Sequence, residues 1–362
     1  MKNRLGDYIQ EISLRNKSDE PIPVYSVTNT QGFCKDYFGK EVASKDKKTY
    51  KIVPKGCFAY NPSRINVGSV DWQRLEERVI VSPLYNVFSV SERIRQQYLY
   101  YYLKSDFVLQ RIRCVATGSV RDNLKIEMLK EFPITIPTLP EQDRIVKILD
   151  DAKRVIDLRK KELDALDKLI KARFVEMFGD ININDKGWTI QPLGELCTIV
   201  RGGSPRPIEQ FLGGDVPWIK IGDATEGESI YLHSTKEHII QEGVKKSRLV
   251  KSGSLIFANC GVSLGFARII KFDGCIHDGW LAMEDIDERI DKVFLLQSLN
   301  QMTEHFRTIA PAGTQPNLNT AIMKAYRQII PPIELQKQYI DFVAQVDKLK
   351  LMLCRYNVNV NK

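Results

Sequence analysis

The chain contains an internal duplication, and this repeat restricts the possible folds more than any other feature. The stretch FPITIPTLPEQDRIVKIL at residues 132–149 returns as YRQIIPPIELQKQYIDFV at residues 326–343. At this offset of 194, identical residues recur in the same order along both halves. The pairs include Arg113 and Arg307, Asn123 and Asn317, Leu124 and Leu318, Lys130 and Lys324, Pro137 and Pro331, and Gln142 and Gln336. The repeat predicts that one folding unit occurs twice.

Each copy is predicted to be a globular domain followed by a helix. We expect a first domain at residues 1–137, a long helix at 138–179, a second domain at 180–332 and a second helix at 333–362. The tripeptides LGD, from Leu5, and LGE, from Leu193, mark corresponding positions near the start of each copy. A length of 362 residues suits two domains better than one.

The first long helix has clear boundary signals. Thr138 and Glu141 have the spacing of a capping box, and Pro140 suits the first turn. Gly179 suits the left-handed position just after a helix. Between these ends, apolar residues alternate at spacings of three and four, which predicts a coiled-coil seam. The apolar seam residues are Leu149, Ala152, Ile156, Leu163, Leu166, Ile170 and Met177, and Arg159 and Arg173 occupy two further seam positions.

The second helix repeats this spacing and offers a partner for the first. Its predicted seam residues are Phe342, Val346, Leu349, Leu353 and Tyr356. A helix of about 40 residues needs a surface to bury its seam, so we expect the two helices to pack antiparallel. The predicted molecule has two globular domains separated by an antiparallel two-helix coiled coil, with approximate two-fold symmetry. The alternative, two unrelated surface helices, does not account for their matching positions.

Both globular domains are predicted to be mixed α/β, with short strands and many loops. Strand-like runs such as PIPVYSVTNT and DVPWIKIGDA occupy corresponding positions in the two copies. A helix, a polar loop and a short helix follow in each copy, and the loops are SVRDNL and TQPNLN. Asn and Gln side chains can hydrogen-bond base edges, but the same residue types also favour an ordinary capped turn. Both interpretations stay open at this point.

The composition limits the setting of the protein. The net charge of +8 is compatible with an acidic partner such as nucleic acid. No run of eighteen apolar residues predicts a membrane span, and the first twenty residues lack the apolar segment of a signal peptide. The seven cysteines contain no C-x-x-C pair, which favours free thiols in the reducing cytoplasm.

Motifs of catalysis and cofactor binding are missing from the sequence. No phosphate-binding G-x-x-x-x-G-K-[ST] or dinucleotide-binding G-x-G-x-x-G occurs in a suitable context. The stretch NPSR at Asn61 resembles the Asn-Pro-Pro-Tyr loop of adenine methyltransferases, but it lacks the second proline and the aromatic residue. The four histidines have no metal-ligand spacing to cysteine or acidic residues. We therefore expect no catalytic residues, no metal and no cofactor in this chain.

The ordered, duplicated set of motifs resembles one family, the specificity (S) subunits of type I restriction–modification systems. The resemblance rests on IPTLPEQDRIVKILD and IPPIELQKQYIDFV, on the helix LRKKELDALDKLIKARFVEMFGD, on LGELCTIVRGGSPRP and VPWIKIGD, and on AGTQPNLN. It covers essentially the whole chain.

This resemblance implies a non-catalytic reader of double-stranded DNA. Each globular half would be a target recognition domain for one half of a bipartite, asymmetric site. The paired helices would set the distance between the domains and dock two methyltransferase (M) subunits. The M subunits would carry S-adenosylmethionine and methylate adenine, and restriction (R) subunits would join for cleavage.

Candidate DNA contacts are polar or basic residues in the strands and loops of both domains. They are Tyr25, Arg64, Arg121, Asn123 and Lys125 in the first domain, and Arg201, Arg206, Lys220, Gln315, Asn317 and Asn319 in the second. Lys and Arg outnumber Asp and Glu by 22 to 15 over residues 1–137, whereas they are outnumbered by 18 to 16 over 180–332. The second domain must therefore gather its positive charges locally, or rely on the M subunits for contacts with the DNA backbone.

Two other functions are compatible with the sequence. A scaffold with two folded ends on a helical spacer would bind proteins and no nucleic acid. A DNA methyltransferase would act by itself, although the missing cofactor loop argues against it. Salt-sensitive binding of duplex DNA by the chain with its M partner distinguishes a specificity subunit from the scaffold. Methyl transfer by the chain alone would identify a methyltransferase.

Overall fold

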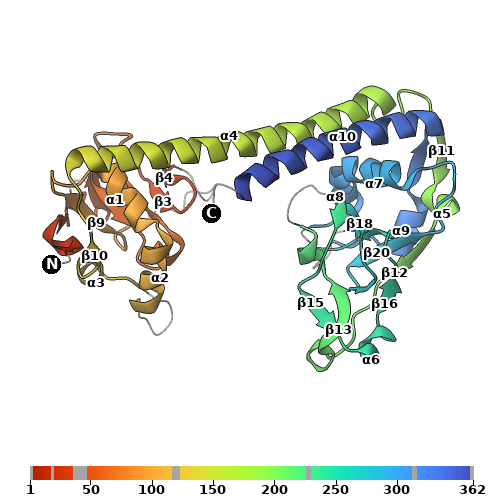
Figure 1. Ribbon diagram of the computed structural model, residues 1–362, viewed down its shortest axis with the longest axis horizontal. Helices are drawn as coiled ribbons and strands as arrows, with labels where there is room; N and C mark the ends of the chain where they lie inside the picture. Colours follow the sequence, from red (N-terminus) through yellow and green to blue (C-terminus); the bar gives the residue numbers. More distant parts are fainter. Residues whose placement is uncertain are drawn as a thin grey trace. The chain divides into compact units, whose positions relative to one another are not determined.

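The computed structural model describes residues 3–17, 20–35, 47–115, 123–225, 230–261, 263–311 and 316–358, with side chains to Leu353. The chain divides into two compact units, unit 1 at Met1–Asp157 and unit 2 at Leu158–Lys362. Both units are mixed α/β, and their elements are labelled in Figure 1. The predicted fold class is confirmed.

Unit 1 is built around an antiparallel sheet with the strand order β2-β9-β6-β7. Smaller antiparallel pairs are β1 with β10, β3 with β4, and β5 with β8. The bounds are β1 (Asn3–Arg4), β2 (Ile9–Glu11), β3 (Ser26–Thr28), β4 (Gly32–Cys34), β5 (Lys51–Pro54), β6 (Phe58–Tyr60), β7 (Val70–Trp72), β8 (Arg78–Val81), β9 (Asn86–Val90), α1 (Gln96–Leu103), α2 (Asp106–Val115), α3 (Ile126–Lys130) and β10 (Pro133–Ile134).

The alternation of side chains along β6 explains how this sheet forms two cores. Phe58 and Tyr60 point to one face, where they pack with residues of α1, α2 and α3. Ala59, between them, points to the other face and packs with residues of β3, β5 and β8. Phe58 also stacks on Phe88 of β9, with ring centroids 5.2 Å apart.

Unit 2 contains a five-stranded sheet, β12-β20-β17-β18-β14, and a four-stranded sheet, β15-β13-β19-β16. Strands β11 and β21 form a separate antiparallel pair. The bounds of the strands are β11 (Thr189–Pro192), β12 (Thr198–Arg201), β13 (Leu212–Ile219), β14 (Tyr231–Leu232), β15 (Glu237–Ile239), β16 (Arg248–Val250), β17 (Leu255–Ala258), β18 (Ala267–Ile270), β19 (Gly274–Ile276), β20 (Trp280–Glu284) and β21 (Arg327–Ile330). The helices are α5 (Leu193–Leu196), α6 (Gln241–Val244), α7 (Lys292–Gln301), α8 (Thr303–Ile309), α9 (Thr320–Ala325) and α10 (Ile333–Val358).

The duplication is visible in the topology. Strands β12-β20-β17-β18 of unit 2 follow the same order as β2-β9-β6-β7 of unit 1, and all are antiparallel. In each unit the first strand also pairs with the strand just before the long helix, β1 with β10 and β11 with β21. The two units therefore share a common fold, as the repeat predicts.

The tripeptides LGD and LGE have the same structural role in the two units. The amide of Leu5 donates to the carbonyl of Phe132, and that of Leu193 donates to Tyr326, both at 2.8 Å. A Cβ on the following glycine would lie 2.9 Å from the Cβ of Lys130 in unit 1 and of Lys324 in unit 2. Glycine is required here because this turn packs directly against α3 or α9.

A buried glutamine fixes each long helix to its domain. In unit 1, Gln142 donates through Nε2 to the carbonyls of Arg93 and Pro137, both at 2.9 Å, and its Oε1 accepts from the amide of Arg95 at 2.8 Å. In unit 2, Gln336 donates to the carbonyls of Arg289 and Pro331 at 2.9 and 2.8 Å and accepts from the amide of Asp291 at 2.8 Å. Both side chains are fully buried. The sequence repeat therefore corresponds to a repeated set of contacts.

Helix α4 (Leu139–Phe178) begins and ends as its sequence predicts. Glu141 accepts hydrogen bonds from the amide and the hydroxyl of Thr138, at 2.9 and 2.8 Å. Gly179 has a φ of +79°, and its amide donates to the carbonyl of Val175 at 2.8 Å. Glycine suits this position because a left-handed backbone is strained for residues with a Cβ.

Within unit 2, α10 packs antiparallel against the C-terminal part of α4 (Figure 1). Tyr339 lies edge-on to the rings of Phe174 and Phe178, and its hydroxyl donates to the carbonyl of Ile170 at 3.3 Å. Farther along α10, Lys350 forms an ion pair with Asp167. Contacts that advance along α10 thus recede along α4, which defines the antiparallel arrangement.

The seam of α10 differs by one position from the prediction. Tyr339, Val343 and Val346 are buried, whereas Leu349 is 51% exposed, so its placement in the seam was wrong. Phe342 is only partly buried, and so is Leu353. The buried positions follow the same spacing of three and four in a different register, which reaches Lys350 instead of Leu349. Lys350 is tolerated in the seam because it forms an ion pair with Asp167 and lies 3.8 Å from Asp347.

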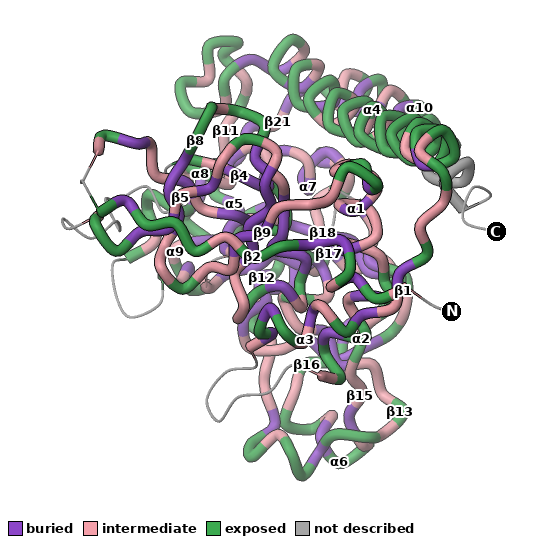
Figure 2. Tube along the Cα trace, turned by 90° about the vertical axis from the view of Figure 1, so that its left-hand side faces the viewer, coloured by how far each residue is buried: buried purple, intermediate pink, exposed green. Residues whose placement is uncertain are grey.

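The seam of α4 is buried only in its C-terminal part. Ile170, Phe174 and Phe178 are buried, and Leu163, Leu166 and Met177 are partly buried. Leu149, Ala152 and Ile156 are exposed, so their predicted burial is not met in this structure. Figure 2 shows α4 largely in the colour of exposed residues. Burial of Phe174 and Phe178 was not predicted, because these residues lie next to the predicted seam positions. In the structure they face the core of unit 2.

Within the residues that the structure describes, no helix is both long enough and apolar enough to cross a membrane.

Candidate nucleic-acid interface

Arg201 is the last residue of strand β12, and the loop that follows it packs closely on residues 276–280 of unit 2. The amide of Gly202 donates to the carbonyl of Trp280 at 2.9 Å, and that of Gly203 donates to Ile276 at 3.0 Å. A Cβ on Gly202 would lie 2.2 Å from the carbonyl oxygen of His277. The two glycines therefore allow the RGGSPRP loop to lie directly against residues 276–280.

This approach creates a group of polar side chains around one carboxylate, which we call the Asp278 cluster: Arg201, Ser204, Arg206, His277 and Asp278. Asp278 Oδ1 accepts from the hydroxyl of Ser204 at 2.8 Å and lies 3.0 Å from His277 Nε2. Asp278 Oδ2 pairs with Arg206 Nη2 at 3.2 Å. The backbone carbonyl of Asp278 accepts from Arg201 Nε at 3.0 Å.

The protonation states in the cluster follow from its geometry. His277 Nδ1 accepts from the amide of Gly279 at 2.8 Å, so the proton of the neutral ring lies on Nε2 and faces Asp278. Burial lowers the pKa of His277, and nearby Lys220, Arg206 and Arg201 add to this effect while Asp278 opposes it. Burial raises the pKa of Asp278, but the bond from Ser204 and the neighbouring His277 and Arg206 outweigh it, so the net pKa is lowered. At neutral pH the cluster holds a neutral imidazole and an ionised carboxylate.

Lys220 lies beside this cluster. It forms an ion pair with Glu237, and its ammonium lies 5.7 Å from the centre of the Trp218 ring. A recess of about 320 Å³ opens next to these residues. It is lined by Ser204, Pro205, Arg206, Pro207, Ile208, Glu209, Trp218 and His277. The surface therefore places the cations Arg201, Arg206 and Lys220 beside a recess lined by both polar and apolar side chains.

The polar loop before α9 packs on the end of β17. The amide of Leu318 donates to the carbonyl of Asn259 at 2.8 Å, and Asn259 Nδ2 donates to Asn317 Oδ1 at 3.0 Å. Asn319 caps α9 by accepting from the amide of Ile322 at 2.9 Å. The side-chain carbonyl groups of Asn317 and Asn319 thus both have partners within the protein, as expected for an ordinary capped turn. Gln315 lies outside the described residues.

Cys260 connects this loop to the Asp278 cluster. It forms an isolated β-bridge with Asn317, and the pKa of its thiol is raised by burial and, secondarily, by Asp278. A thiol with a raised pKa is a poor nucleophile at neutral pH. Cys260, His277 and Asp278 therefore do not have the electrostatics of a cysteine–histidine catalytic pair.

Unit 1 repeats the packing of the polar loop. The amide of Leu124 donates to the carbonyl of Pro62 at 3.1 Å, and the hydroxyl of Ser63 donates to Asn123 Oδ1 at 2.6 Å. This arrangement brings Asn123 close to the stretch that carries Arg64, and both Arg64 and Lys125 are exposed. Arg121 lies outside the described residues.

The structure argues against Tyr25 as a DNA contact. Its side chain is 7% exposed and packs in a core with Val27 and Phe33, and Lys35 covers its ring at 5.3 Å. A residue buried in this way supports strands β3 and β4. Tyr25 was predicted as a DNA contact, and its burial depends on packing that the local sequence does not reveal.

Sequence analysis missed three members of the cluster, namely Ser204, His277 and Asp278. The structure brings them to Arg201 and Arg206, which were predicted. The only local signal is the pair of glycines in RGGSPRP, because adjacent glycines often mark a close backbone approach. The partner segment is more than 70 residues away in sequence, so this signal could not identify Asp278.

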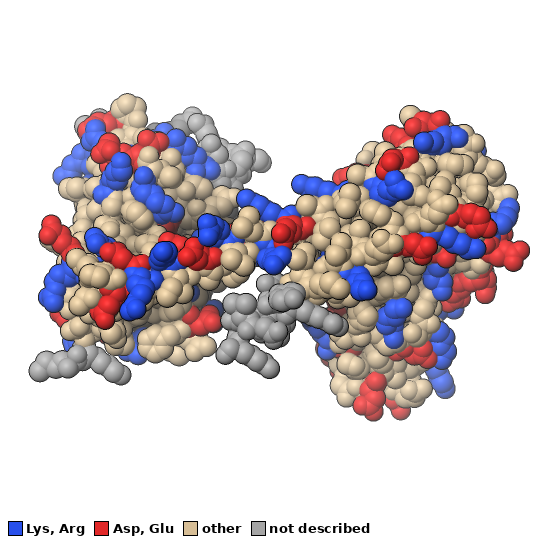
Figure 3. Space-filling view, turned by 45° about the horizontal axis from the view of Figure 1, so that its top comes forward, with Lys and Arg blue, Asp and Glu red and all other residues tan. Residues whose placement is uncertain are grey.

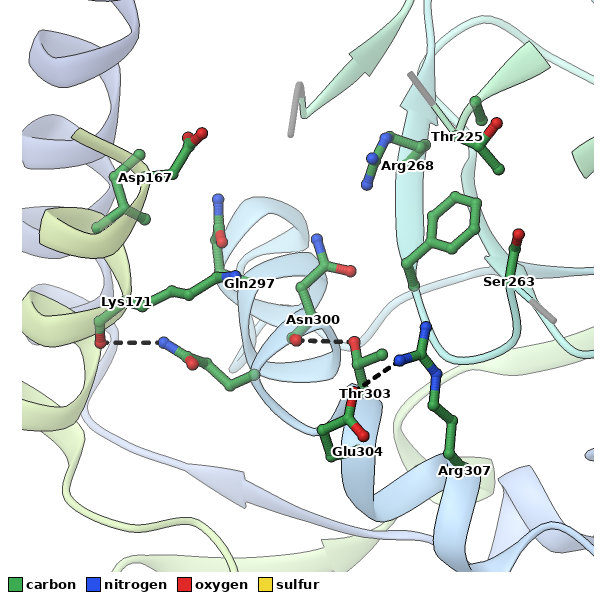
Figure 4. A pocket seen from close by; sticks show the side chains of 14 residues that line it. Asp167, Lys171, Thr225, Ser263, Arg268, Gln297, Asn300, Thr303, Glu304 and Arg307 are labelled. Carbon is green, nitrogen blue, oxygen red and sulfur yellow. Dashed lines mark hydrogen bonds and ion pairs between the residues drawn. The ribbon is translucent and has the colours of Figure 1, made fainter. Parts of the chain in front are cut away.

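A second cavity of about 470 Å³ lies between α4, α7, α8 and β18 in unit 2 (Figure 4). Its lining carries both signs of charge, including the ion pair of Arg307 with Glu304 at 2.6 Å. Gln301 donates to the backbone carbonyl of Lys171 at 3.0 Å across one side of it. We assign this cavity to the packing of α4 on unit 2, because none of the predicted DNA contacts line it.

The charges are mixed over the visible surface. Figure 3 shows Lys and Arg interspersed with Asp and Glu, as in the ion pairs of Arg159 with Glu162 and of Arg173 with Glu176 along α4. On the face drawn in Figure 3, positive charge therefore occurs locally. Over the described ranges, His, Cys, Asp and Glu side chains form no group of three or more that could hold a metal ion.

Comparison with models of known protein families shows which family this chain belongs to. The family model described as "Type I restriction modification DNA specificity domain" matches this chain twice, at residues 8–168 and 185–357. The chain belongs to this family. The two matches correspond to the two halves of the repeat, so the protein consists of two specificity domains, and the resemblance seen in its motifs is confirmed.

Curated relatives are named as specificity subunits. The MjaIX specificity subunit of Methanocaldococcus jannaschii is 25% identical over 270 residues, which cover 68% of this chain and 61% of that protein. The StySPI specificity subunit of Salmonella potsdam is 21% identical over 363 residues, covering 94% of this chain and 78% of that protein. The chain thus aligns with about three fifths of the length of the MjaIX relative.

Solved structures share the fold. A chain from a type I restriction–modification system, solved to explain complex assembly and conformational transition, superimposes with a TM-score of 0.61 at 18% identity. The alignment covers 99% of the specificity-domain chain described here and 92% of that chain. The type I S subunit from M. genitalium has a TM-score of 0.51 at 15% identity, covering 100% and 92% of the two chains.

Proposed function

We propose that this chain is the DNA-specificity subunit of a type I restriction–modification complex and that each unit reads one half of a bipartite, asymmetric DNA site. The observation that carries the proposal is the duplication, which extends from the family matches to the glutamine contacts and the packed polar loops. Two copies of one recognition domain suit two short DNA sequences, and their divergent loop residues make the site asymmetric.

In unit 2, the proposed DNA-contacting surface is the Asp278 cluster together with Lys220. Arg201 and Arg206 are exposed, and Lys220 is about one third exposed, so these cations can contact phosphates and bases. In unit 1, we propose Asn123 and Lys125, which lie on the equivalent polar loop just before α3, and Arg64, which follows Ser63, the partner of Asn123. The packing of both polar loops leaves their flanking side chains in defined positions.

We propose that the long helices dock two methyltransferase (M) subunits. Apolar side chains are exposed along α4, including Ile148 and Leu158, and along α10, including Leu351 and Met352. The M subunits would hold S-adenosylmethionine and methylate adenine, and R subunits would add DNA cleavage. The specificity chain itself would carry no cofactor and perform no catalysis, and we expect it in the cytoplasm.

One observation favours a different function, a scaffold that binds only proteins. Asp and Glu outnumber Lys and Arg in the sequence of the second domain, by 18 to 16 over residues 180–332. A surface without excess positive charge binds DNA phosphates weakly. The specificity function remains preferred because M subunits can supply phosphate contacts.

A binding experiment separates the two functions. The chain would be purified with its M subunits and titrated with duplex DNA containing its methylation motif at several salt concentrations. The specificity function predicts tight binding that falls steeply with salt, and much weaker binding to a scrambled duplex. Equal affinity for both duplexes would rule out sequence recognition and favour the scaffold.

A further inference from the structure

Arg201 is held by one atom of its guanidinium group. Its Nε donates to the backbone carbonyl of Asp278 at 3.0 Å. Its two terminal nitrogens, Nη1 and Nη2, have no hydrogen-bond partner among the residues that the structure describes. Because Arg201 is exposed, this pair of nitrogens is available to a ligand while the base of the group is anchored.

The anchor of Arg201 is itself rigid. Arg201 is the last residue of β12 and pairs with Leu281 of β20. The side chain of Asp278 is fixed by Ser204 at 2.8 Å, by His277 at 3.0 Å and by Arg206 at 3.2 Å. The carbonyl that orients Arg201 therefore belongs to a residue held by three side chains. An arginine oriented in this way loses little further freedom when it binds.

The other two cations of this surface, Arg206 and Lys220, each form an ion pair through a terminal nitrogen. Arg206 uses a terminal nitrogen for its ion pair with Asp278, and Lys220 uses its ammonium for Glu237. Their charges suit phosphate contacts, which tolerate many geometries. Arg201 alone of these three residues offers two terminal nitrogens without a partner within the described part of the chain.

We propose that Arg201 reads a guanine in the half-site of unit 2, through hydrogen bonds from Nη1 and Nη2 to guanine O6 and N7. The planar fork of arginine matches these two acceptors in the major groove, and this is the commonest base-specific contact in protein–DNA complexes. Asp278 acts as the positioning residue. The inference rests on the proposed function, because it requires unit 2 to bind DNA.

The test uses the complex with its M subunits and maps the methylated motif. Arg201→Lys keeps the charge but loses the fork. We expect the requirement for guanine to disappear at one position of the second half-site, with a loss of roughly 5- to 150-fold in discrimination there. The first half-site and the spacer should stay unchanged. Arg327→Lys, at an exposed arginine of β21, is the matched control and should keep the full motif.

A second variant predicts a new preference. Glutamine hydrogen-bonds adenine N6 and N7 in the way that arginine binds guanine. Arg201→Gln should therefore shift the preferred base at that same position from guanine to adenine. A structural role for Arg201 would instead weaken methylation at all sites without changing the motif, and this result would overturn the proposal.

A measurement on the unaltered protein is independent of whether the variants fold. Each guanine of the second half-site would be replaced in turn by 7-deazaguanine, which lacks the N7 acceptor. We expect one replacement to weaken binding of the unaltered complex by more than fivefold, roughly the loss of one base contact. No effect at any position, or a half-site without guanine on either strand, would overturn the role of Arg201. Failure of the proposed function would look different, since the unaltered complex would then bind no specific sequence.

Discussion

At the scale of single residues, the buried glutamines show why the repeat persists in the sequence. Gln142 and Gln336 each satisfy two carbonyls and one amide that precede or cap other elements. These backbone groups are shielded from water, and an unsatisfied buried polar group costs about 1–3 kcal/mol. A side chain with both donor and acceptor atoms is needed, so few substitutions are tolerated.

We predict that Gln336→Leu will lower the free energy of unfolding of unit 2 by about 2–4 kcal/mol, because three backbone groups lose their partner. Urea denaturation followed by tryptophan fluorescence measures the effect, since Trp188, Trp218 and Trp280 all lie in unit 2. Gln338→Leu, at an exposed position of the same helix, is the control and should change stability by less than about 0.5 kcal/mol. Equal effects of the two variants would contradict the role of Gln336.

The roles of single residues were predicted correctly where they depend on neighbours that are close in sequence. The capping residues Thr138 and Glu141 and the left-handed Gly179 were predicted correctly because each acts within a few residues of the helix end. Asp278 was missed because its partners Ser204 and Arg206 lie more than 70 residues earlier in the chain. Tyr25 was predicted as a DNA contact although it is buried, because much of the core around it comes from strands distant in sequence, such as β5 and β8.

At the scale of elements, the register of α10 is set by its attachment to unit 2. Gln336 fixes the first turn, and Tyr339, Val343 and Val346 then follow on the same face at spacings of three and four. The spacing in the sequence predicted Leu349 in the seam, whereas the structure leaves it exposed. Contacts with Phe174 and Phe178 of α4 decide between the predicted and the observed register.

This register predicts unequal effects of two substitutions on α10. Tyr339→Ala should destabilise unit 2 by about 3–5 kcal/mol, because it removes a fully buried ring that contacts two phenylalanines. Leu349→Ala should change stability by less than about 0.5 kcal/mol, because that side chain is half exposed. Thermal and urea unfolding of both variants provide the comparison. The opposite ranking would restore the register predicted from the sequence.

The ion pair of Lys350 with Asp167 gives a second prediction for this helix pair. Both side chains are largely buried, so Asp167→Asn should destabilise unit 2 by about 1–3 kcal/mol, because Lys350 then keeps only the more distant Asp347, at 3.8 Å, as a counter-charge. The double variant Asp167→Leu with Lys350→Met should recover most of this loss, since an apolar pair can replace a buried ion pair. Unfolding of the two variants under the same conditions tests this. A double variant less stable than Asp167→Asn would contradict an ion pair that serves mainly to neutralise charge.

At the scale of the whole molecule, the long helix is proposed to set the distance between two recognised DNA sequences. Four residues inserted after Lys160 would lengthen α4 by about 6 Å, at roughly 1.5 Å per residue. This site precedes the ion pair of Asp167 with Lys350 that joins α4 to α10. We predict that the unread spacer of the methylated motif will grow by one or two base pairs, with both half-sites unchanged. A seven-residue insertion should lengthen the spacer further, and an unchanged spacer in both variants would exclude the ruler role.

The overall architecture was accessible from the sequence because it is duplicated. Two copies of each signal, such as the LG turns and the glutamines, distinguished the pattern from chance and predicted the mixed α/β units and the antiparallel helices. Burial of Leu149, Ala152 and Ile156 was predicted from periodicity alone, and these residues are exposed in the structure. Periodicity identifies a surface that suits a partner, but it does not identify the partner.

The most direct test of the central claim is a map of methylated adenines in the genome of a host that expresses this chain together with its M subunits. The account predicts one asymmetric motif in two parts, with a spacer of fixed length between them. Exchange of residues 180–332 for the same segment of a relative should change one part only. A continuous motif, or methylation that does not depend on this chain, would contradict the claim that its two units read DNA separately.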